Sequence, residues 1–146
     1  LLNIATAEGV NPRLITLEVV EGDTLLSGSV SMEVVGRLRL NDIGLAVDDF
    51  GVGKATLEGL HQMPFTELKV EGSFVRGALT DPNANALVEY AIDLGQRLDL
   101  DIVAEGVETG AQLDHVARLG CTHAQGFHIT RPLRADDVVQ WIEDRR

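Results

Sequence analysis

The sequence predicts an α/β protein built on a parallel sheet, because short apolar stretches alternate with helix-like stretches along the whole chain. Alternation of this kind places the strands in parallel, with the helices outside the sheet. Polar residues follow the predicted strands, at the edge where (β/α)8 barrels build their active sites. We count about five β-α units, so a closed barrel requires about three further strands before residue 1. A doubly wound sheet is the alternative, and periodicity alone does not decide between the two architectures.

Composition narrows the classes of partner and location. The chain has 146 residues, 45% of them hydrophobic, which is enough to bury a core. The formal net charge of −11 excludes a nucleic-acid polymer as partner, since such partners require a basic face. A small nucleotide is compatible with this charge if a bound metal ion coordinates its phosphates. Cys121 is the only cysteine, which excludes internal disulfides and fits a reducing, cytoplasmic location. No apolar run approaches the roughly 20 residues of a membrane span, so we expect no membrane contact.

The first half of the chain is predicted to contain three strands. Residues 1–8 have the pattern of a helix end closed by Gly9. The elements expected after it are a strand over 14–19, a helix over 25–40, a strand over 43–48, a helix over 55–62 and a strand over 67–71. Pro64 ends the last of these helices.

The second half is predicted to add two strands and three helices. Asp81 and Pro82 form a cap and first-turn proline, which predicts the start of a long helix that runs to Leu98. The elements expected after it are a strand over 101–105, a helix over 111–119, a strand over 122–127 and a helix over 135–142.

Two adjacent carboxylates end the strand over 43–48. The apolar run from Ile43 to Val47 leads directly to Asp48 and Asp49, and a glycine-rich turn follows. Neighbouring side chains in a strand point to opposite faces, so these two can share a site only where the backbone bends. Close carboxylates repel each other unless a cation or a shared proton lies between them. The pattern therefore predicts a divalent metal site at the rim of the sheet.

Several motifs follow one another along the chain: Leu17-Glu18-Val19-Val20-Glu21, Asp48-Asp49-Phe50-Gly51-Val52-Gly53, Leu68-Lys69-Val70-Glu71, Val103-Ala104-Glu105-Gly106-Val107-Glu108-Thr109, Gln125-Gly126-Phe127 and Arg131-Pro132-Leu133. In this order they resemble the motifs of the EAL domain family of cyclic-di-GMP phosphodiesterases. The match covers nearly the whole chain and corresponds to the C-terminal portion of the domain. It implies a (β/α)8 barrel of the TIM type, of which residues 1–146 form the last five or so units, truncated on the N-terminal side.

The resemblance also implies an activity and a set of metal ligands. The family uses Mg²⁺ or Mn²⁺ to open cyclic-di-GMP to linear pGpG. By position in the motifs, Glu18, Asp48 and Glu105 would be metal ligands. Asp49 would hold a second metal ion or the attacking water, and Lys69 would orient that water. Carboxylates are hard oxygen ligands that suit both ions.

Four further residues take roles from the same motifs. Gln125 would bind near the attacking water, and Glu71 would be catalytic, although the family usually has Asp there. Glu21 would anchor the glycine-rich loop. Glu108 would lie behind the metal ligands or near a guanine base, and the alternative is that it caps the helix beginning at Thr109.

Three functions are compatible with these motifs. The family's name-giving Glu-Ala-Leu segment and its asparagine ligand are absent, and we expect both upstream; without them the 146 residues alone would not turn over. With them, the parent protein would be a phosphodiesterase. The first alternative is a degenerate receptor that binds cyclic-di-GMP without cutting it, since four positions depart from the family pattern: Glu71 for aspartate, Gly72 for a commonly seen arginine, Val52 for threonine and Lys54 for tyrosine. The second is a scaffold or dimerisation module. The partners expected are cyclic-di-GMP, upstream regulatory domains and, in a homodimer, a second copy of the chain.

Overall fold

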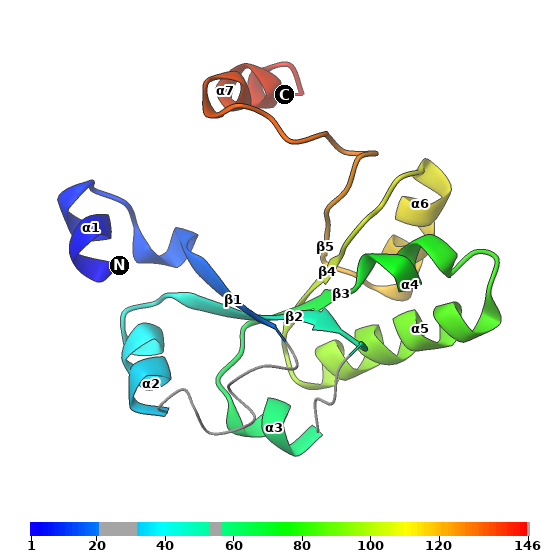
Figure 1. Ribbon diagram of the computed structural model, residues 1–146, viewed down its shortest axis with the longest axis horizontal. Coiled ribbons are helices and arrows are strands. Elements are labelled where there is room, and N and C mark those ends of the chain that lie inside the picture. Colours follow the sequence, from blue (N-terminus) through cyan, green and yellow to red (C-terminus); the bar gives the residue numbers. More distant parts are fainter. Residues whose placement is uncertain (21–31, 53–56, 146) are drawn as a thin grey trace.

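Five parallel strands form one sheet in which neighbours in space are also neighbours in sequence (Figure 1). The computed structural model describes residues 1–20, 32–52 and 57–145. The strands are β1 (Thr16–Val20), β2 (Gly44–Phe50), β3 (Glu67–Val70), β4 (Asp101–Ala104) and β5 (His123–Ala124). A doubly wound sheet reverses its strand order at a switch point. The order here runs β1 to β5 without reversal, so the described strands form an arc of a (β/α)8 barrel, as expected.

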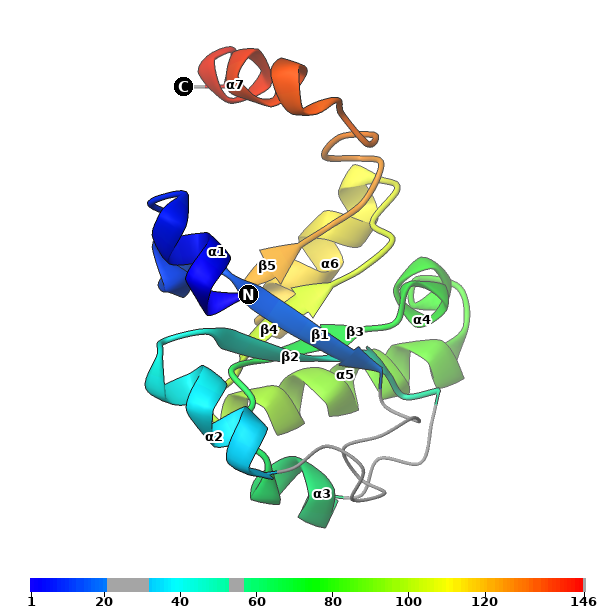
Figure 2. The same ribbon diagram turned by 60° about the vertical axis from the view of Figure 1, so that its left-hand side comes forward.

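Helices connect the strands, and several of them cover one face of the sheet. They are α1 (Leu2–Ala7), α2 (Met32–Leu40), α3 (Leu57–Gln62), α4 (Gly72–Gly77), α5 (Pro82–Arg97), α6 (Gly110–Leu119) and α7 (Ala135–Glu143). A short 3-10 helix, Pro12–Leu14, precedes β1. Figure 2 shows α2, α3 and α5 below the sheet, whereas α7 lies apart from it. None of the helices in the described ranges has the length and apolar character needed to cross a membrane.

Alternation within the strands separates a core face from a polar face. Leu68 and Ile102 are completely buried and pack with Val88 and Ile92 of α5 in the main core cluster. Side chains one residue further along a strand point the opposite way, as Lys69 does in β3. The apolar face therefore holds each strand against the helices and leaves the other face free to carry charged groups.

Most predicted elements are confirmed, and the start of α5 follows the predicted chemistry. The side chain of Asp81 accepts a hydrogen bond of 2.9 Å from Asn83 N, and Pro82 occupies the first helical position. One helix was missed, and one expected strand was too long. Helix α4 was not foreseen, because a six-residue helix with glycine at both ends gives little periodic signal. The strand expected over 122–127 is confined to β5, because the chain turns beyond it and Thr130 N donates to Gly126 O.

We expect Gly95→Ala to destabilise the fold, although glycine to alanine in a helix interior normally stabilises by about 1 kcal/mol. A Cβ atom added at Gly95 of α5 would lie 2.6 Å from Cγ1 of Ile102 in β4. Overpacking of this kind costs roughly 1–3 kcal/mol, which exceeds the gain in helix propensity. Urea unfolding measures the difference in free energy.

Gly36→Ala is the matched control. Gly36 lies inside α2, and beyond the helix's own backbone no heavy atom of the described residues lies within 4 Å of an added Cβ. The same substitution should therefore raise the free energy of unfolding there. Stabilisation at Gly95 would show that the contact between α5 and β4 is looser than described.

Candidate metal centre

Lys69 lies at the centre of a cluster of acidic side chains on the polar face of the sheet. Its Nζ is 2.8 Å from Oε1 of Glu18, 2.8 Å from Oδ1 of Asp48 and 2.8 Å from Oε1 of Glu105. The Lys69 side chain is only 6% exposed, whereas that of Glu18 is 52% exposed. One ammonium group thus holds together carboxylates contributed by β1, β2 and the segment after β4.

The register of the parallel strands brings these groups to one edge. Glu18 is paired with Ala46, two residues before Asp48, and Lys69 is paired with Val103, two residues before Glu105. Residues two apart in a strand share a face, and parallel strands all end at the same edge. The structure therefore brings the carboxylates of Glu18, Asp48 and Glu105 together around Lys69 at this edge.

The acidic surroundings keep Lys69 charged. Burial by itself lowers the pKa of Lys69, but the contacts with Asp48, Glu105 and Glu18 raise it by more. The net pKa lies above the ordinary value for a lysine. Lys69 is therefore charged at neutral pH when these carboxylates surround it.

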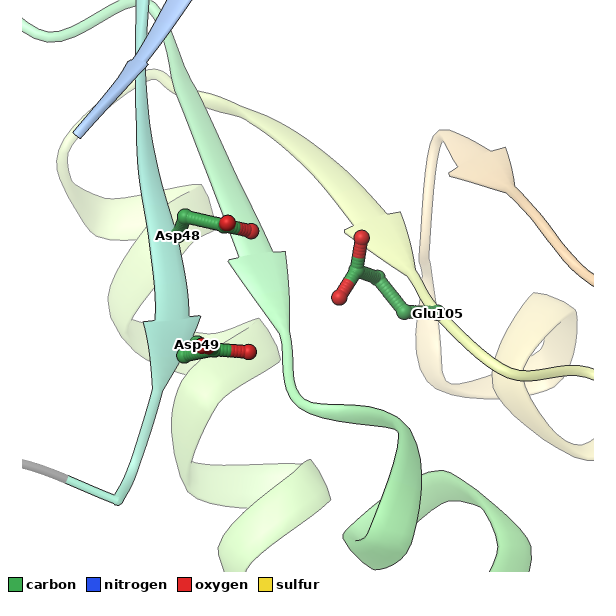
Figure 3. A group of neighbouring side chains, drawn as sticks. All are labelled: Asp48, Asp49 and Glu105. Atoms are coloured by element: carbon green, nitrogen blue, oxygen red, sulfur yellow. The ribbon is translucent and has the colours of Figure 1, made fainter. Parts of the chain in front are cut away.

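Asp49 joins the cluster through a local break in β2. Its backbone has φ +55°, in the left-handed region, and the register of β2 on β3 shifts between Val47 and Phe50. The sequence argument required such a bend before two consecutive aspartates could share a site, and the bend is present. Figure 3 shows the carboxylates of Asp48 and Asp49 both directed toward the side of Glu105.

The donor set fits a hard divalent cation. Asp48, Asp49 and Glu105 each offer a carboxylate oxygen, and these atoms lie within 4.8 Å of one another. Oδ1 of Asp48 is buried and has no hydrogen-bond partner among the described residues. Its 2.8 Å contact with Lys69 Nζ is thus an ion pair without hydrogen-bond geometry. An under-satisfied carboxylate oxygen beside two others is the kind of ligand that Mg²⁺, Mn²⁺ or Ca²⁺ prefers.

Glu71 lies at the same edge of the sheet but is engaged by a helix end. Its carboxylate accepts a 2.8 Å hydrogen bond from Ser73 N and another from the Ser73 hydroxyl, and so caps α4. Burial raises the pKa of Glu71, but these hydrogen bonds and the charge of Arg76 together lower it by more, so the net pKa lies below the ordinary value for a glutamate. A catalytic role for Glu71 stays a prediction.

The other predicted residues follow β4 or β5, or lie outside the described part of the chain. Gln125 follows β5, and its backbone carbonyl oxygen accepts a 3.0 Å hydrogen bond from Val107 N. Glu108 is exposed and follows Glu105 by three residues. The alternative prediction, that Glu108 caps α6, was wrong, because Thr109 is the N-cap of that helix. Glu21 lies outside the described residues.

Sequence reasoning missed one polar residue in this region. Gln112 is buried in α6 and forms a capping box with Thr109, in which each side chain accepts from the other's backbone N–H. The spacing Thr-x-x-Gln before an apolar run is the signal that could have identified it.

The chain is similar to a known protein family, to curated proteins and to solved structures. The family model described as "EAL domain" matches residues 1–132. The bifunctional diguanylate cyclase/cyclic di-GMP phosphodiesterase MucR of Pseudomonas aeruginosa is 35% identical over 137 residues, which is 94% of this chain and 20% of MucR. The structure of the MucR phosphodiesterase in complex with c-di-GMP aligns with a TM-score of 0.87 at 35% identity, over 94% of this chain and 56% of that one. Klebsiella pneumoniae BlrP1 in a manganese/cy-diGMP complex aligns with a TM-score of 0.81 at 29% identity, over 90% of this chain and 33% of that one.

We expect Lys69→Met to lower the free energy of unfolding at neutral pH. The substitution keeps the volume but leaves three carboxylates without their cation, and breaking a buried ion pair costs about 3–5 kcal/mol. Because Glu18 is half exposed, the lower end of this range applies. In the variant, the three carboxylates repel one another with no cation between them. Protonation therefore relieves the repulsion, and the difference from wild type shrinks as the pH falls through about 4.

Arg97→Met is the control for this experiment. Arg97 pairs with Asp93 at 2.7 Å on the exposed surface of α5, where ion pairs contribute little. Urea unfolding at pH 7 and pH 4 should therefore show a pH-dependent defect only for Lys69→Met. A defect of equal size at both pH values would contradict charge repulsion as its cause.

Proposed function

The chain belongs to the EAL domain family, and from this premise we propose that it forms part of a metal-dependent phosphodiesterase that hydrolyses cyclic-di-GMP to linear pGpG. The observation that carries the proposal is the convergence of Asp48, Asp49 and Glu105 beside a buried lysine, at the edge of the barrel where active sites are built. The phosphodiesterase named in the description of MucR supports the choice of substrate.

Glu18, Asp48, Asp49 and Glu105 would hold the metal, which we propose to be Mg²⁺ or Mn²⁺. Such ions lower the pKa of bound water and stabilise the attacking and leaving oxygens of an in-line phosphoryl displacement. The manganese in the BlrP1 complex supports this choice. Oδ1 of Asp48 is buried and pairs with the ammonium group of Lys69 at 2.8 Å, so it already lies in surroundings that a cation would share.

Lys69 would act as a cation in the reaction. Its ammonium group would orient a water or offset charge on the phosphoryl oxygens. It also balances the ligand carboxylates in the absence of metal, which allows the strands to approach each other. Deprotonation of the nucleophilic water would fall to another group.

The remaining parts of the centre would come from outside the chain. The chain spans 20% of MucR and 56% of the chain in the MucR phosphodiesterase structure. We propose that the other strands of the barrel, the Glu-Ala-Leu segment, the asparagine ligand and the regulatory domains belong to the parent polypeptide. The 146 residues alone would then lack turnover.

A receptor that binds cyclic-di-GMP without cutting it is the second candidate. The engagement of Glu71 in the cap of α4 favours it, because this carboxylate stands where the family usually has an aspartate near the reaction. An extra methylene moves a carboxylate by roughly an ångström, and misplacement on this scale can slow catalysis about a hundredfold.

We expect the parent protein to convert cyclic-di-GMP to pGpG in the presence of Mn²⁺, measured by chromatography. Asp48→Asn should lower kcat/KM by at least about a hundredfold, because loss of a ligand exceeds the 10–100-fold effect of losing a ligand's supporting partner. Asp114→Asn removes the same charge from the exposed surface of α6 and should leave turnover unchanged. Absence of product from a folded protein that still binds the dinucleotide would support the receptor instead.

Metal binding has a readout independent of turnover. We expect Mn²⁺ or Ca²⁺ to raise the Tm of the parent protein, since a ligand that binds only the folded state stabilises it. Asp48→Asn should abolish most of this shift, whereas Asp114→Asn should retain it. Equal shifts in both variants would place metal binding elsewhere.

A further inference from the structure

The segment that carries Glu105 is held from both sides. We define residues 105–109, which follow β4, as the Glu105 loop. On one side Val107 N donates to Gln125 O at 3.0 Å and His128 N donates to Val107 O at 3.0 Å, which ties the loop to the segment after β5. The Val107 side chain is completely buried. The Glu105 loop is therefore integrated into the fold.

On the other side the loop lies against the start of α4. Gly106 has φ +63°, and a Cβ added to it would lie 3.0 Å from Cα of Gly72 and 2.5 Å from Nη1 of Arg76. Only glycine allows the two backbones to approach this closely at this φ. Helix α4 follows β3 almost directly, so this contact connects the segments that carry Lys69 and Glu105.

Gln112 connects the same two segments by hydrogen bonds. Its side-chain oxygen accepts from Glu108 N at 2.8 Å and from Thr109 N at 3.0 Å, and its Nε2 donates to Arg76 O at 3.3 Å. The bond to Thr109 completes the capping box of α6. The bonds to Glu108 and Arg76 reach beyond α6, into the Glu105 loop and the end of α4. A buried amide thus uses both of its polar atoms to join three segments.

We propose that Gln112 is a positioning residue, which fixes the Glu105 loop against α4 and so sets the Glu105 carboxylate relative to Lys69 and Asp48. This inference rests on the metal centre of the proposed function and adds a residue that does not touch it. Partners that hold a metal ligand in place typically change metal affinity about 10–100-fold when removed.

An amide is required at position 112 for this role. A glutamate completes a capping box as well as a glutamine does. However, a carboxylate cannot donate to the Arg76 carbonyl and would repel its oxygen. Gln112→Glu therefore keeps the cap of α6 and removes only the bond to α4, which separates positioning from helix stability.

The experiment compares metal binding by the full-length parent protein and by Gln112→Glu. Calorimetric titration with Mn²⁺ alone should show affinity about tenfold or more weaker in the variant. Turnover of cyclic-di-GMP should recover at high Mn²⁺, with KM for the dinucleotide little changed. Gly106→Ala, which pushes the same loop away from Gly72, should show the same loss of affinity.

Thr122→Val is the matched control. Its hydroxyl accepts a 2.7 Å hydrogen bond from Ile102 N at the opposite end of β4, so its loss should lower Tm without weakening Mn²⁺ binding. Three outcomes would each overturn the inference, because the role of Gln112 would then be only structural. They are an equal loss of Mn²⁺ affinity in Thr122→Val and Gln112→Glu, no loss of affinity in Gln112→Glu, and failure of Gln112→Glu to fold. A wild-type protein that binds Mn²⁺ but makes no pGpG would contradict the proposed function alone.

Discussion

The arrangement depends on one ammonium group balancing three carboxylates. The chain carries a net charge of −11, and the parallel sheet directs several of its acids to a single edge. Without a cation, charges at such distances would repel strongly in a partly buried site. Lys69 supplies that cation from the middle of the sheet, with contacts to acids on both sides of β3. The core face of the same strand, through Leu68 and Val70, prevents the lysine from moving away.

Residue patterns were sufficient to predict the part of the site that depends on strand geometry. Glu18, Asp48 and Glu105 each end or follow an apolar stretch, and parallel strands end together. Their convergence therefore needed no knowledge of side-chain packing. The choice between a barrel and a doubly wound sheet was different, because it depends on which strands pair across long separations. Local periodicity contains no information about that order, whereas the resemblance to a family did.

The features that escaped prediction depend on short or distant contacts. Helix α4 is a single short element with glycine at both ends. Glu71 caps this helix, but in the sequence it looks like any charged residue at the end of a strand. The bond from Gln112 to Arg76 spans 36 residues. A capping box at Thr109 is visible in sequence, but the third partner of its glutamine is not. When each motif is considered alone, the second structural role of such a polar residue is therefore missed.

Asp49 shows why a site of this kind and a regular strand are incompatible. Two consecutive carboxylates face the same side only if strand alternation fails, and here it fails through φ +55° at Asp49 and a register shift against β3. A left-handed non-glycine residue costs of order 1–3 kcal/mol, and aspartate is among the residues that tolerate it best. Bringing a second carboxylate toward Asp48 adds repulsion to that strain. The repulsion falls when a divalent cation lies between the oxygens, so a bound ion offsets part of the cost of the arrangement that the backbone break creates.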